Sequence, residues 1–297
     1  MPSFTFPQFL KRYPNDDACL DEMFDRAYKD LQTCPTCEKQ TKWHRVKKRK
    51  CYACQHCGHH LYPLAKTPFK SSKLPLTHWF FAILLFSNSK NGVSAKELQR
   101  QLGVSYPTAW RMGHVIRDMM DESGEIVLHS DVEIDETLVG GRKRGGKRGW
   151  GSENKTCVFG MVSRGSKIRT QVVPDRKAKT LFPIIVNHTE EDVTAYTDDF
   201  RGYSKLGREV ADHKTVNHSA KVYVDPDDRN NHTNTIEGHW SIVKRSIRGT
   251  HTAVSRKHLQ RYLNEFDFRR NHRTECLFDA ILNRSVSEHS PGKEKGG

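Results

Sequence analysis

Two pairs of cysteines constrain the fold of this chain more than any other feature of its sequence. Cys34 and Cys37 form the motif CPTC, and Cys54 and Cys57 form the motif CQHC. Two CxxC pairs at this spacing are typical of a zinc ribbon, in which four thiolates bind one tetrahedral Zn²⁺. A module of about forty residues buries too little apolar surface to fold unaided, and the ion supplies the missing folding energy. We therefore predict a zinc ribbon over residues 31–72.

A fifth cysteine, Cys51, competes for the same site because it forms a further pair, CYAC, with Cys54. We favour Cys54 and Cys57 as ligands, since His56 and Gly58 then shape the second pair. Four thiolates saturate zinc, so Cys51 is predicted to be a spare thiol. The same reasoning predicts surface positions or nucleic-acid contacts for the nearby histidines, which are His44, His56, His59 and His60. The alternative for the cysteines is that they are incidental thiols that bind no metal.

The charge of the chain points to a polyanionic partner. Lysine and arginine number 49 against 35 aspartate and glutamate residues in a chain of 297, which leaves a formal net charge of +14. A basic excess of this size is the electrostatic footprint of a nucleic-acid-binding protein. A basic protein without a special partner is the alternative.

Nothing in the sequence predicts a membrane-bound or exported protein. The longest apolar run, WFFAILLF at residues 79–86, is far shorter than the roughly 20 residues that a membrane-spanning helix needs. The N-terminus lacks the cationic start and apolar core of a secretion signal. We therefore expect a cytoplasmic protein, associated with the nucleoid, in which disulfides do not form.

Residues 73–124 have a helical pattern, in segments near 75–88, 94–102 and 105–121. Ser94 and Glu97 form a capping box, Gly103 makes a turn, and Ser105 can cap the last helix. This is the pattern of a helix-turn-helix, whose second helix can enter the major groove of DNA. The residues near the start of that helix are predicted to contact DNA, and they are Tyr106, Thr108 and Arg111. An ordinary helical hairpin is the alternative.

Beyond Gly124 short β-prone segments alternate with helical ones, which predicts an α/β domain over residues 125–285. The expected strands are IVLHSDVEIDETLV, TCVFGMVS, IRTQVVP and DVTAYTD. KAKTLFPIIVNHT is expected to form a helix, with Pro183 at a kink or in the first turn. Two more helices are expected over residues 234–248 and 255–270. Residues 286–297 are poor in apolar side chains and are expected to be disordered.

Three acidic residues of this region stand on different elements. Asp135 and Asp198 are expected at the ends of strands, and Glu237 on a helix. Three carboxylates from separate elements can hold two divalent metal ions about 3.5–4 Å apart, of which one activates a water or a 3′-hydroxyl and the other stabilises the leaving oxygen. We predict these acids as ligands of Mg²⁺ or Mn²⁺. Lys244 follows Glu237 by two helical turns and shares its face. Each acid taken singly has a plainer interpretation as a solvated strand or helix end.

Neighbouring acids are given lesser roles. Asp131 and Glu133 are predicted to be solvated or to support the metal site from behind, and Asp199 is the hardest to tell apart from Asp198. The glycines of VEIDETLVGGRKRGG allow close approach of DNA, and the cations after them are predicted to grip phosphate. These cations are Arg142, Lys143, Arg144, Lys147 and Arg148. Arg245 and Arg248, beside Lys244, are predicted as further DNA contacts.

The order of these parts resembles that of the bacterial insertion-sequence transposases of the DDE class, in the group with an N-terminal zinc ribbon and a helix-turn-helix. The resemblance runs from about Cys34 to Arg273. The motifs that carry it are CPTC, CQHC followed by TPF, GVSAKELQRQLGVSYPTAWRMGHVIR, DETLVGG, VFGMV, TDDFRGY, VNHSAKVYV and HTNTIEGHWSIVKRSIRGTHTAVSRKHLQRYLNEFDFRRNHR.

This resemblance implies an RNase-H-like catalytic fold that cleaves and transfers DNA strands with divalent metal ions at the ends of the element. The family's first acid falls on Asp135 and its second on Asp198. Its third acid, which some members replace with asparagine, falls on Glu237, and its helix-borne lysine falls on Lys244. The implied partner is double-stranded DNA, as terminal inverted repeats and as target, bound by a homo-oligomer.

Three departures from the family pattern concern the ribbon. Glu38 stands where a glycine usually follows the first cysteine pair, Lys66 stands where a glycine usually precedes TPF, and Cys51 is an extra thiol. None of these departures changes one of the three acids. They bear on the shape of the ribbon and leave an intact enzyme as the expectation.

The sequence therefore predicts helices over residues 1–30, the ribbon, the helix-turn-helix region, the catalytic domain and a disordered tail. Two other functions stay open. A zinc-ribbon and helix-turn-helix regulator whose C-terminal domain only dimerises would explain the charge, but it leaves the three separated acids without a role. A nuclease of the same fold would cleave without rejoining, and an inactive relic would do neither.

Overall fold

The computed structural model describes residues 4–47, 49–141, 154–216 and 228–286. The chain forms two compact units. The first contains residues up to Ser89, the segment Ala95–Met119 and the residues from Thr274 onward. The second contains Lys90–Ser94 and Met120–Arg273. The predicted cations at positions 142, 143, 144, 147 and 148 lie outside the described residues, as does nearly all of the predicted tail.

The helices of the first unit are α1 (Phe6–Arg12), α2 (Asp16–Tyr28), α3 (Leu76–Asn88), α4 (Ala95–Leu102), α5 (Tyr106–Met119) and α9 (Leu277–Arg284). Thr5 and Gln8 form a capping box at α1, and the side chain of Asn15 caps α2. The chain breaks between these two helices because Pro14 disfavours a helical conformation in the residue before it. The first unit therefore begins with two short helices.

Aromatic side chains form the core where α1, α3 and α9 meet. The ring centroid of Phe278 on α9 lies 4.8 Å from that of Phe4, 5.7 Å from that of Tyr13 and 6.2 Å from that of Phe80. Arg26 on α2 also makes an ion pair with Asp279 on α9. The last helix therefore packs in the first unit, although the sequence places its residues inside the range expected for the catalytic domain.

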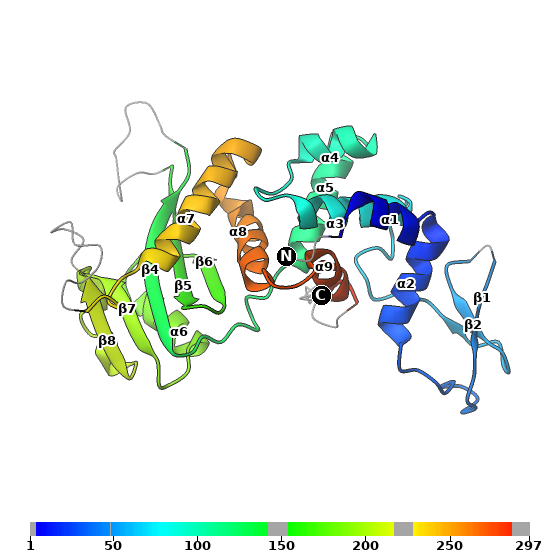
Figure 1. The fold of residues 1–297 in the computed structure, drawn as a ribbon, viewed down its shortest axis with the longest axis horizontal. Coiled ribbons are helices and arrows are strands. Elements are labelled where there is room, and N and C mark those ends of the chain that lie inside the picture. The colour runs from blue at the N-terminus through cyan, green and yellow to red at the C-terminus, as the bar shows by residue number, and fades with distance from the viewer. Residues whose placement is uncertain (1–3, 48, 142–153, 217–227, 287–297) are drawn as a thin grey trace, which may run out of the picture. The chain divides into compact units, whose positions relative to one another are not determined.

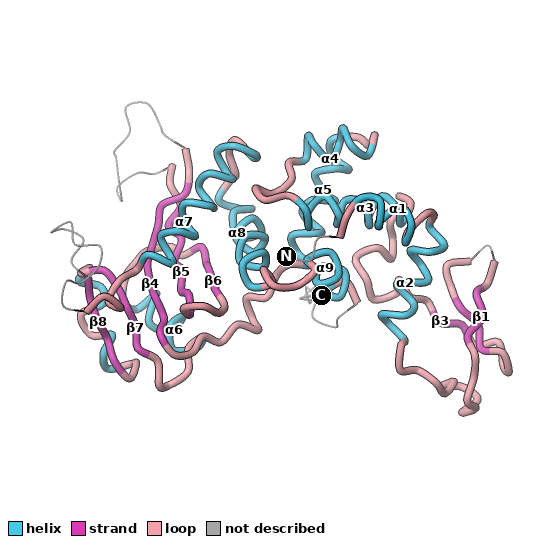
Figure 2. Tube along the Cα trace, viewed as in Figure 1, coloured by secondary structure: helices cyan, strands magenta, loops and turns pink. Residues whose placement is uncertain are grey.

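The residues between α2 and α3 form a small antiparallel sheet. Its strands are β1 (Trp43–Arg45), β2 (Tyr52–Cys54) and β3 (His60–Leu61), in the order β1-β2-β3. Trp43 pairs with Cys54, and Tyr52 pairs with Leu61. Of these short strands, drawn in Figure 2, β1 lies between the two cysteine pairs, β2 ends at the first cysteine of the second pair, and β3 follows that pair.

The second unit is built on a mixed sheet of β4 (Asp131–Val139), β5 (Thr156–Ser163), β6 (Ile168–Val172), β7 (Thr194–Asp198) and β8 (Asp212–Val216). The strand order is β6-β5-β4-β7-β8, so β4 is the central strand. The strands β5 and β6 follow as antiparallel neighbours, whereas β7 runs parallel to β4, and β8 parallel to β7. The sequence did not predict β8, because its residues, DHKTV, are mostly polar and form an edge.

Helices cover both faces of this sheet. They are α6 (Ala178–His188), α7 (Asn234–Ser246) and α8 (Arg256–Asn271), and a π-helical turn, Ile247–His251, follows α7. Alternate strand residues face opposite sides: Ile134 of β4 packs in one core with Leu181 and Ile185 of α6. Val139 of the same strand packs in the other core with Trp240 of α7. Pro183 lies inside α6, past its first turn.

The position of α9 leads to a first prediction. Phe278→Ala should lower the free energy of unfolding by about 3–5 kcal/mol, because it leaves a cavity among fully buried aromatic rings. Hydrogen exchange should show the loss in peptides of α1 and α3, while peptides of β4 and β5 keep their protection. Faster exchange in β4 and β5 instead would mean that the last helix belongs to the sheet domain.

Candidate active site and metal centre

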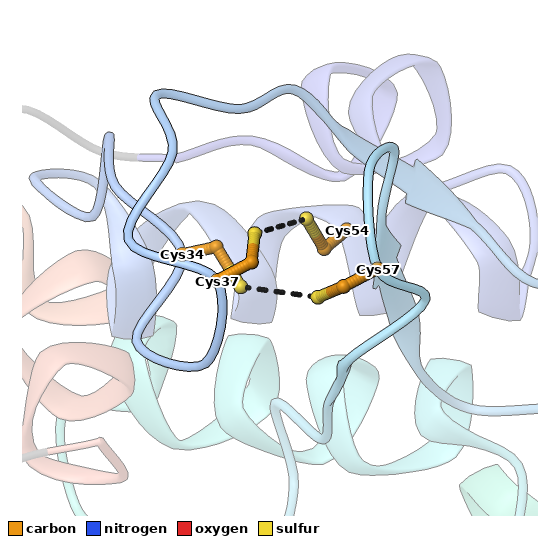
Figure 3. Close-up of side chains that lie close together, drawn as sticks. All are labelled: Cys34, Cys37, Cys54 and Cys57. Carbon is orange, nitrogen blue, oxygen red and sulfur yellow. Dashed lines mark hydrogen bonds between the residues drawn. The ribbon is translucent and has the colours of Figure 1, made fainter.

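The cysteines of the two CxxC pairs meet in one cluster (Figure 3). Cys34 Sγ lies 3.6 Å from Cys57 Sγ, Cys37 Sγ lies 3.8 Å from Cys54 Sγ, and all four sulfurs lie within 4.8 Å of one another. A tetrahedral zinc site with bonds of 2.3 Å requires sulfur–sulfur separations of about 3.8 Å. A disulfide would require about 2.05 Å. The cluster thus fits Zn²⁺, and Cys51 is buried outside it.

The two knuckles have the same backbone turn. The amide of Glu38 donates to Cys34 O at 2.9 Å, and the amide of Gly58 donates to Cys54 O at 3.0 Å. Their φ angles are 55° and 73°, in the left-handed region that favours glycine. This conformation agrees with the glycine that the resemblance led us to expect at position 38. Glu38 adopts the turn at some cost, so the departure from the pattern leaves the knuckle intact.

Polar groups favour a thiolate at Cys54, whereas at Cys57 a hydrogen bond from the His59 backbone is outweighed by burial and the neighbouring sulfurs, which raise the pKa of Cys57 to about 12. Burial raises the pKa of Cys54, but hydrogen bonds from Thr41 and from backbone amides outweigh it and lower the pKa to about 5. Thr41 Oγ1 lies 3.2 Å from Cys54 Sγ, and the amide of His56 lies 3.4 Å from the same sulfur. Thiolates are the form of cysteine that binds metal.

The predicted DNA-contact residues of the first unit lie on α5. Gly103, with a φ of 64°, makes the turn between α4 and α5, and Ala109 and Met112 face the core. Tyr106 is 42% exposed and Arg111 is exposed, whereas Thr108 is half-buried. The Thr108 hydroxyl lies 2.9 Å from that of Ser105, which makes it a capping contact as well.

The sequence analysis missed Trp110, which is 37% exposed one turn after Tyr106. Trp110 lies outside the apolar stripe of α5, and this position in the sequence could have predicted its exposure. Lys96 Nζ, on α4, lies 5.0 Å from the centre of the Tyr106 ring. Aromatic and cationic side chains therefore share this surface of the two helices, which suits contact with bases and phosphates.

The second unit brings two of the predicted acids side by side. Asp131 pairs with Thr194 and Glu133 with Tyr196 in the parallel ladder of β4 and β7. The same register carried two residues further places Asp135 beside Asp198, on one face of neighbouring strands. The structure corrects one detail, because Asp135 lies in the middle of β4 and not at a strand end. Asp198 does end β7, as predicted.

Helix α7 covers these acids, and Trp240 is its contact with Asp135. The indole Nε1–H donates to Asp135 Oδ2 at 2.9 Å. The ring lies over Gly160, the residue of β5 that pairs with Asp135, and a Cβ at Gly160 would come within 2.5 Å of it. The glycine of VFGMV is therefore required for this packing. Glu237 and Lys244 lie one turn to either side of Trp240, so they share its face of α7.

The charges at this site repel one another. Burial, together with the charges of Glu136 and Asp198, raises the pKa of Asp135 to about 8, although the hydrogen bond from Trp240 acts to lower it. The pKa of Lys244 is lowered by burial, although Asp135 acts to raise it, and Arg248 and Lys155 lower it further. The carboxylates of Asp135 and Asp198 thus lie in the same part of the second unit as the cations Lys244, Arg248 and Lys155. Carboxylates crowded in this way are stabilised by a divalent cation.

The other acids of VEIDE are differently placed. Glu133 is fully buried and accepts hydrogen bonds from Arg164 and from the start of α7. Glu136 faces the opposite side of the sheet, where the Tyr203 hydroxyl donates to it, and burial raises its pKa to about 7. Asp135 also faces α7, and among the described residues its side-chain hydrogen-bond donor is Trp240.

The third predicted acid, Glu237, does not form a close cluster with Asp135 and Asp198. Glu237 lies in the first turn of α7, where it accepts a hydrogen bond from the Thr233 hydroxyl at 3.2 Å. Within the described ranges, the four cysteines are the group of metal-ligating residues whose ligand atoms all lie within 4.8 Å of one another, and Asp135, Asp198 and Glu237 do not form such a group. Asp198 Oδ1 accepts from the Phe200 amide at 3.0 Å, and Asp199 is exposed.

Two predicted DNA contacts, Arg245 and Arg248, are exposed on α7 and on the turn that follows it. In the part of the chain that the structure describes, none of the helices is both long and apolar enough to cross a membrane.

Comparison with known proteins gives the class of this chain. Residues 127–271 match the model of the ISXO2-like transposase domain. An uncharacterized protein in transposable element ISH50 of Halobacterium salinarum is 29% identical over 258 residues, which cover 80% of this chain and 84% of that protein. An uncharacterized transposase-like protein of Haemophilus influenzae is 32% identical over 105 residues, which cover 35% of this chain and 81% of that protein.

A mixed α/β unit with paired acids, preceded by a four-cysteine cluster, thus occurs in a chain whose relatives are transposase-like. The chain is an insertion-sequence transposase. It belongs with the transposase-like proteins, and its residues 127–271 match the ISXO2-like transposase domain.

The cysteine geometry predicts the effect of metal removal. Chelation of zinc, or Cys34→Ser, should unfold residues 31–72, because the small sheet depends on the ion for its stability. Metal analysis should find one zinc per chain in the wild type and in Cys51→Ser, which serves as the matched control. Loss of a full equivalent of zinc from Cys51→Ser would show that a different set of thiolates binds the metal.

The repulsion at Asp135 predicts a pH dependence in protein without added Mg²⁺ or Mn²⁺. Because the folded pKa, about 8, lies above the usual value of 3.8, the stability due to this group is complete at acidic pH and is lost as pH rises toward 8. The stability of the second unit, measured by hydrogen exchange, should therefore fall more steeply from pH 5 to 8 in the wild type than in Asp135→Asn. Parallel pH profiles would contradict this assignment.

Proposed function

We propose that this transposase binds the ends of its insertion sequence and catalyses metal-dependent DNA strand cleavage and strand transfer. The observation that carries the proposal is that the charge of Asp198, at the end of β7, acts on Asp135 of the neighbouring parallel strand β4, under a helix whose Trp240 contacts Asp135. A regulator without catalysis has no use for repelling carboxylates at the centre of its sheet, since charges buried together destabilise a fold.

The sheet topology supports an RNase-H-like catalytic domain. Three antiparallel strands followed by two strands parallel to the first, with helices on both faces, agree with the fold that the family resemblance implies. The acids stand on the central strand β4 and on its parallel neighbour β7. Side chains on two adjacent strands are held at a fixed spacing, which suits a site that must coordinate metal ions rigidly.

Asp135, Asp198 and Glu237 are the residues that would hold the catalytic metal. Bound Mg²⁺ or Mn²⁺ would supply an activated hydroxyl nucleophile and stabilise the leaving oxygen of a phosphodiester. The mutual repulsion of the two aspartates favours a cation between them. Glu237 stands at the start of α7, and a change in its side-chain rotamer, or the DNA itself, would complete the ligand set.

The cations of α7 and its surroundings would position the DNA. Lys244 faces the acids, and Arg245, Arg248 and Lys155 extend the positive surface beyond it. Such side chains bind phosphate oxygens and hold the scissile bond in line with the metal site. The charged segment after Gly141 would contribute the predicted Arg142, Lys143, Arg144, Lys147 and Arg148.

The first unit would recognise the ends of the element. We propose that α4 and α5 act as a helix-turn-helix, with Tyr106, Trp110 and Arg111 at the DNA and Thr108 as a nearby support. The zinc ribbon would add further contacts to DNA. Because an element has two ends, we propose that the protein acts as a homo-oligomer on DNA, in the nucleoid of the cytoplasm.

The test is cleavage of labelled element ends in Mg²⁺, beside a binding assay on the same DNA. Asp135→Asn, Asp198→Asn and Glu237→Gln should each lower cleavage and strand transfer by on the order of 1,000-fold or more, because each removes a charged ligand. End binding should persist. Asp199→Asn, the exposed neighbour, is the matched control and should cut at nearly the wild-type rate.

Two results would count against the proposal. Normal cutting by all three acid variants would remove the catalytic assignment and favour the regulator. Cleavage by the wild type without joining of pre-cut ends to a target would favour a nuclease of the same fold.

A further inference from the structure

We propose that Glu133 is a positioning residue that docks the start of α7 onto β4 and thereby sets Glu237 opposite Asp135. The inference rests on the proposed function for its catalytic consequence. The docking itself rests on the contacts of one buried carboxylate.

Both oxygens of Glu133 are occupied by donors. Oε2 accepts from the backbone amides of Thr235 at 2.8 Å and Ile236 at 3.0 Å. Oε1 accepts from the Thr235 hydroxyl at 2.8 Å and from Arg164 Nε at 2.8 Å, and His232 Nδ1 lies 3.3 Å away. Glu133 is 0% exposed. A carboxylate with this many donors has no oxygen left for a metal ion.

The two amides belong to the first turn of α7. The start of a helix has backbone amides without intrahelical partners and a partial positive charge, so a carboxylate there is stabilising. In α7 the N-cap residue, Thr233, turns its hydroxyl to Glu237 and does not cap the helix. The strand therefore supplies the capping group. This arrangement ties the first turn of the helix to a fixed point on β4.

The fixed point lies next to the predicted metal site. Glu133 and Asp135 are two residues apart on one face of β4, about 7 Å along the strand. On α7, Glu237 follows Ile236 directly, and Trp240 reaches Asp135 one turn later. Contacts from Glu133 and from Asp135 thus hold the helix at two successive turns. Glu237 follows the residues that Glu133 contacts and precedes Trp240, so it lies between the two points of attachment along the helix.

Arg164 completes the docking contact. Its guanidinium donates to Glu133 and to the carbonyl oxygen of His232 at 2.8 Å, and it stacks over the Tyr196 ring at 4.0 Å. The arginine therefore joins β4, β7 and the segment before α7. It also neutralises the buried charge of Glu133, which would otherwise be costly.

A glutamine cannot replace Glu133 in this position. Each group that contacts the carboxylate at 2.8–3.0 Å is a donor. A glutamine amide would oppose one of these donors with its own NH₂ group, whichever way it was turned. The first turn of α7 should therefore move away from β4 in Glu133→Gln, and Glu237 should move with it.

Hydrogen exchange tests the docking without any metal or DNA. In Glu133→Gln, amides in a peptide covering residues 233–240 should exchange at least about tenfold faster, because the capping acceptor is lost. Peptides of α6 and α8 should be unchanged. Thr235→Val, which removes one donor and keeps both amides, should give a smaller increase and serves if the glutamine variant fails to fold. Wild-type exchange in this turn in the folded variants would overturn the proposal.

Metal affinity tests the positioning role. Titration with Mn²⁺ alone, followed by calorimetry, should show binding about 3–10-fold weaker in Glu133→Gln, and cleavage of element ends in Mg²⁺ should fall about 10–100-fold with end binding kept. Ile185→Val, in the core on the opposite face of the sheet, is the control for lost stability. It should lower the melting temperature and leave Mn²⁺ affinity unchanged.

The outcomes separate the two proposals. If Glu133→Gln is less stable but binds Mn²⁺ and cleaves like the wild type, Glu133 only supports the fold and the positioning role is overturned. If the wild type itself neither binds Mn²⁺ nor cleaves DNA, the proposed function fails. The exchange of α7 then still decides whether Glu133 docks the helix.

Discussion

Crowding of carboxylates on the central strand is the constraint around which the second unit is organised. Glu133, Asp135 and Glu136 lie within four residues of β4, and Asp198 stands beside them on β7. Negative charges this close cannot all be buried without compensation. Arg164 and the start of α7 offset Glu133, and the Tyr203 hydroxyl serves Glu136. Fewer donors offset the charges of Asp135 and Asp198. A cation bound at these two acids would therefore stabilise the fold most.

The same compensation determines where α7 lies. Glu133 attracts its first turn, Trp240 donates to Asp135 one turn later, and Gly160 provides the space for the indole ring. A helix placed by polar contacts to acids is thereby aligned with those acids. Structural packing and the predicted chemistry depend on one set of contacts in this unit, so substitutions there should affect both.

The first unit meets a different constraint, because its small sheet has little apolar core of its own. Zn²⁺ bound by the cysteine cluster would compensate with metal–ligand bonds, and the convergence of four sulfurs within 4.8 Å of one another leaves little freedom to the two knuckles. Glu38 illustrates how strong the constraint is. It takes up a left-handed conformation that suits glycine better, since the thiolates on either side of the turn must converge.

Much of this structure could be predicted from local sequence. The four zinc-ligand cysteines are identified by short spacings, the turn between α4 and α5 by Gly103, and the strand β7 with its terminal Asp198 by a β-prone run. Each of these signals lies within a few residues of the feature it predicts. Local signals failed where long-range packing decides, as for the polar edge strand β8 and for α9, whose Phe278 finds its partners at the other end of the chain.

The sequence by itself predicted the kind of site, because cysteine pairs and separated acids together in a basic chain are typical of a metal-dependent protein that acts on nucleic acid. Which acid of VEIDE does what was decided by the tertiary structure. Alternation along β4 sends Glu136 to one face, and Glu133 and Asp135 to the other. The donors that α7 and Arg164 bring from distant positions then enclose Glu133 and leave Asp135 beside Asp198. No local pattern holds that information, since it depends on which residues far along the chain come to lie against each carboxylate.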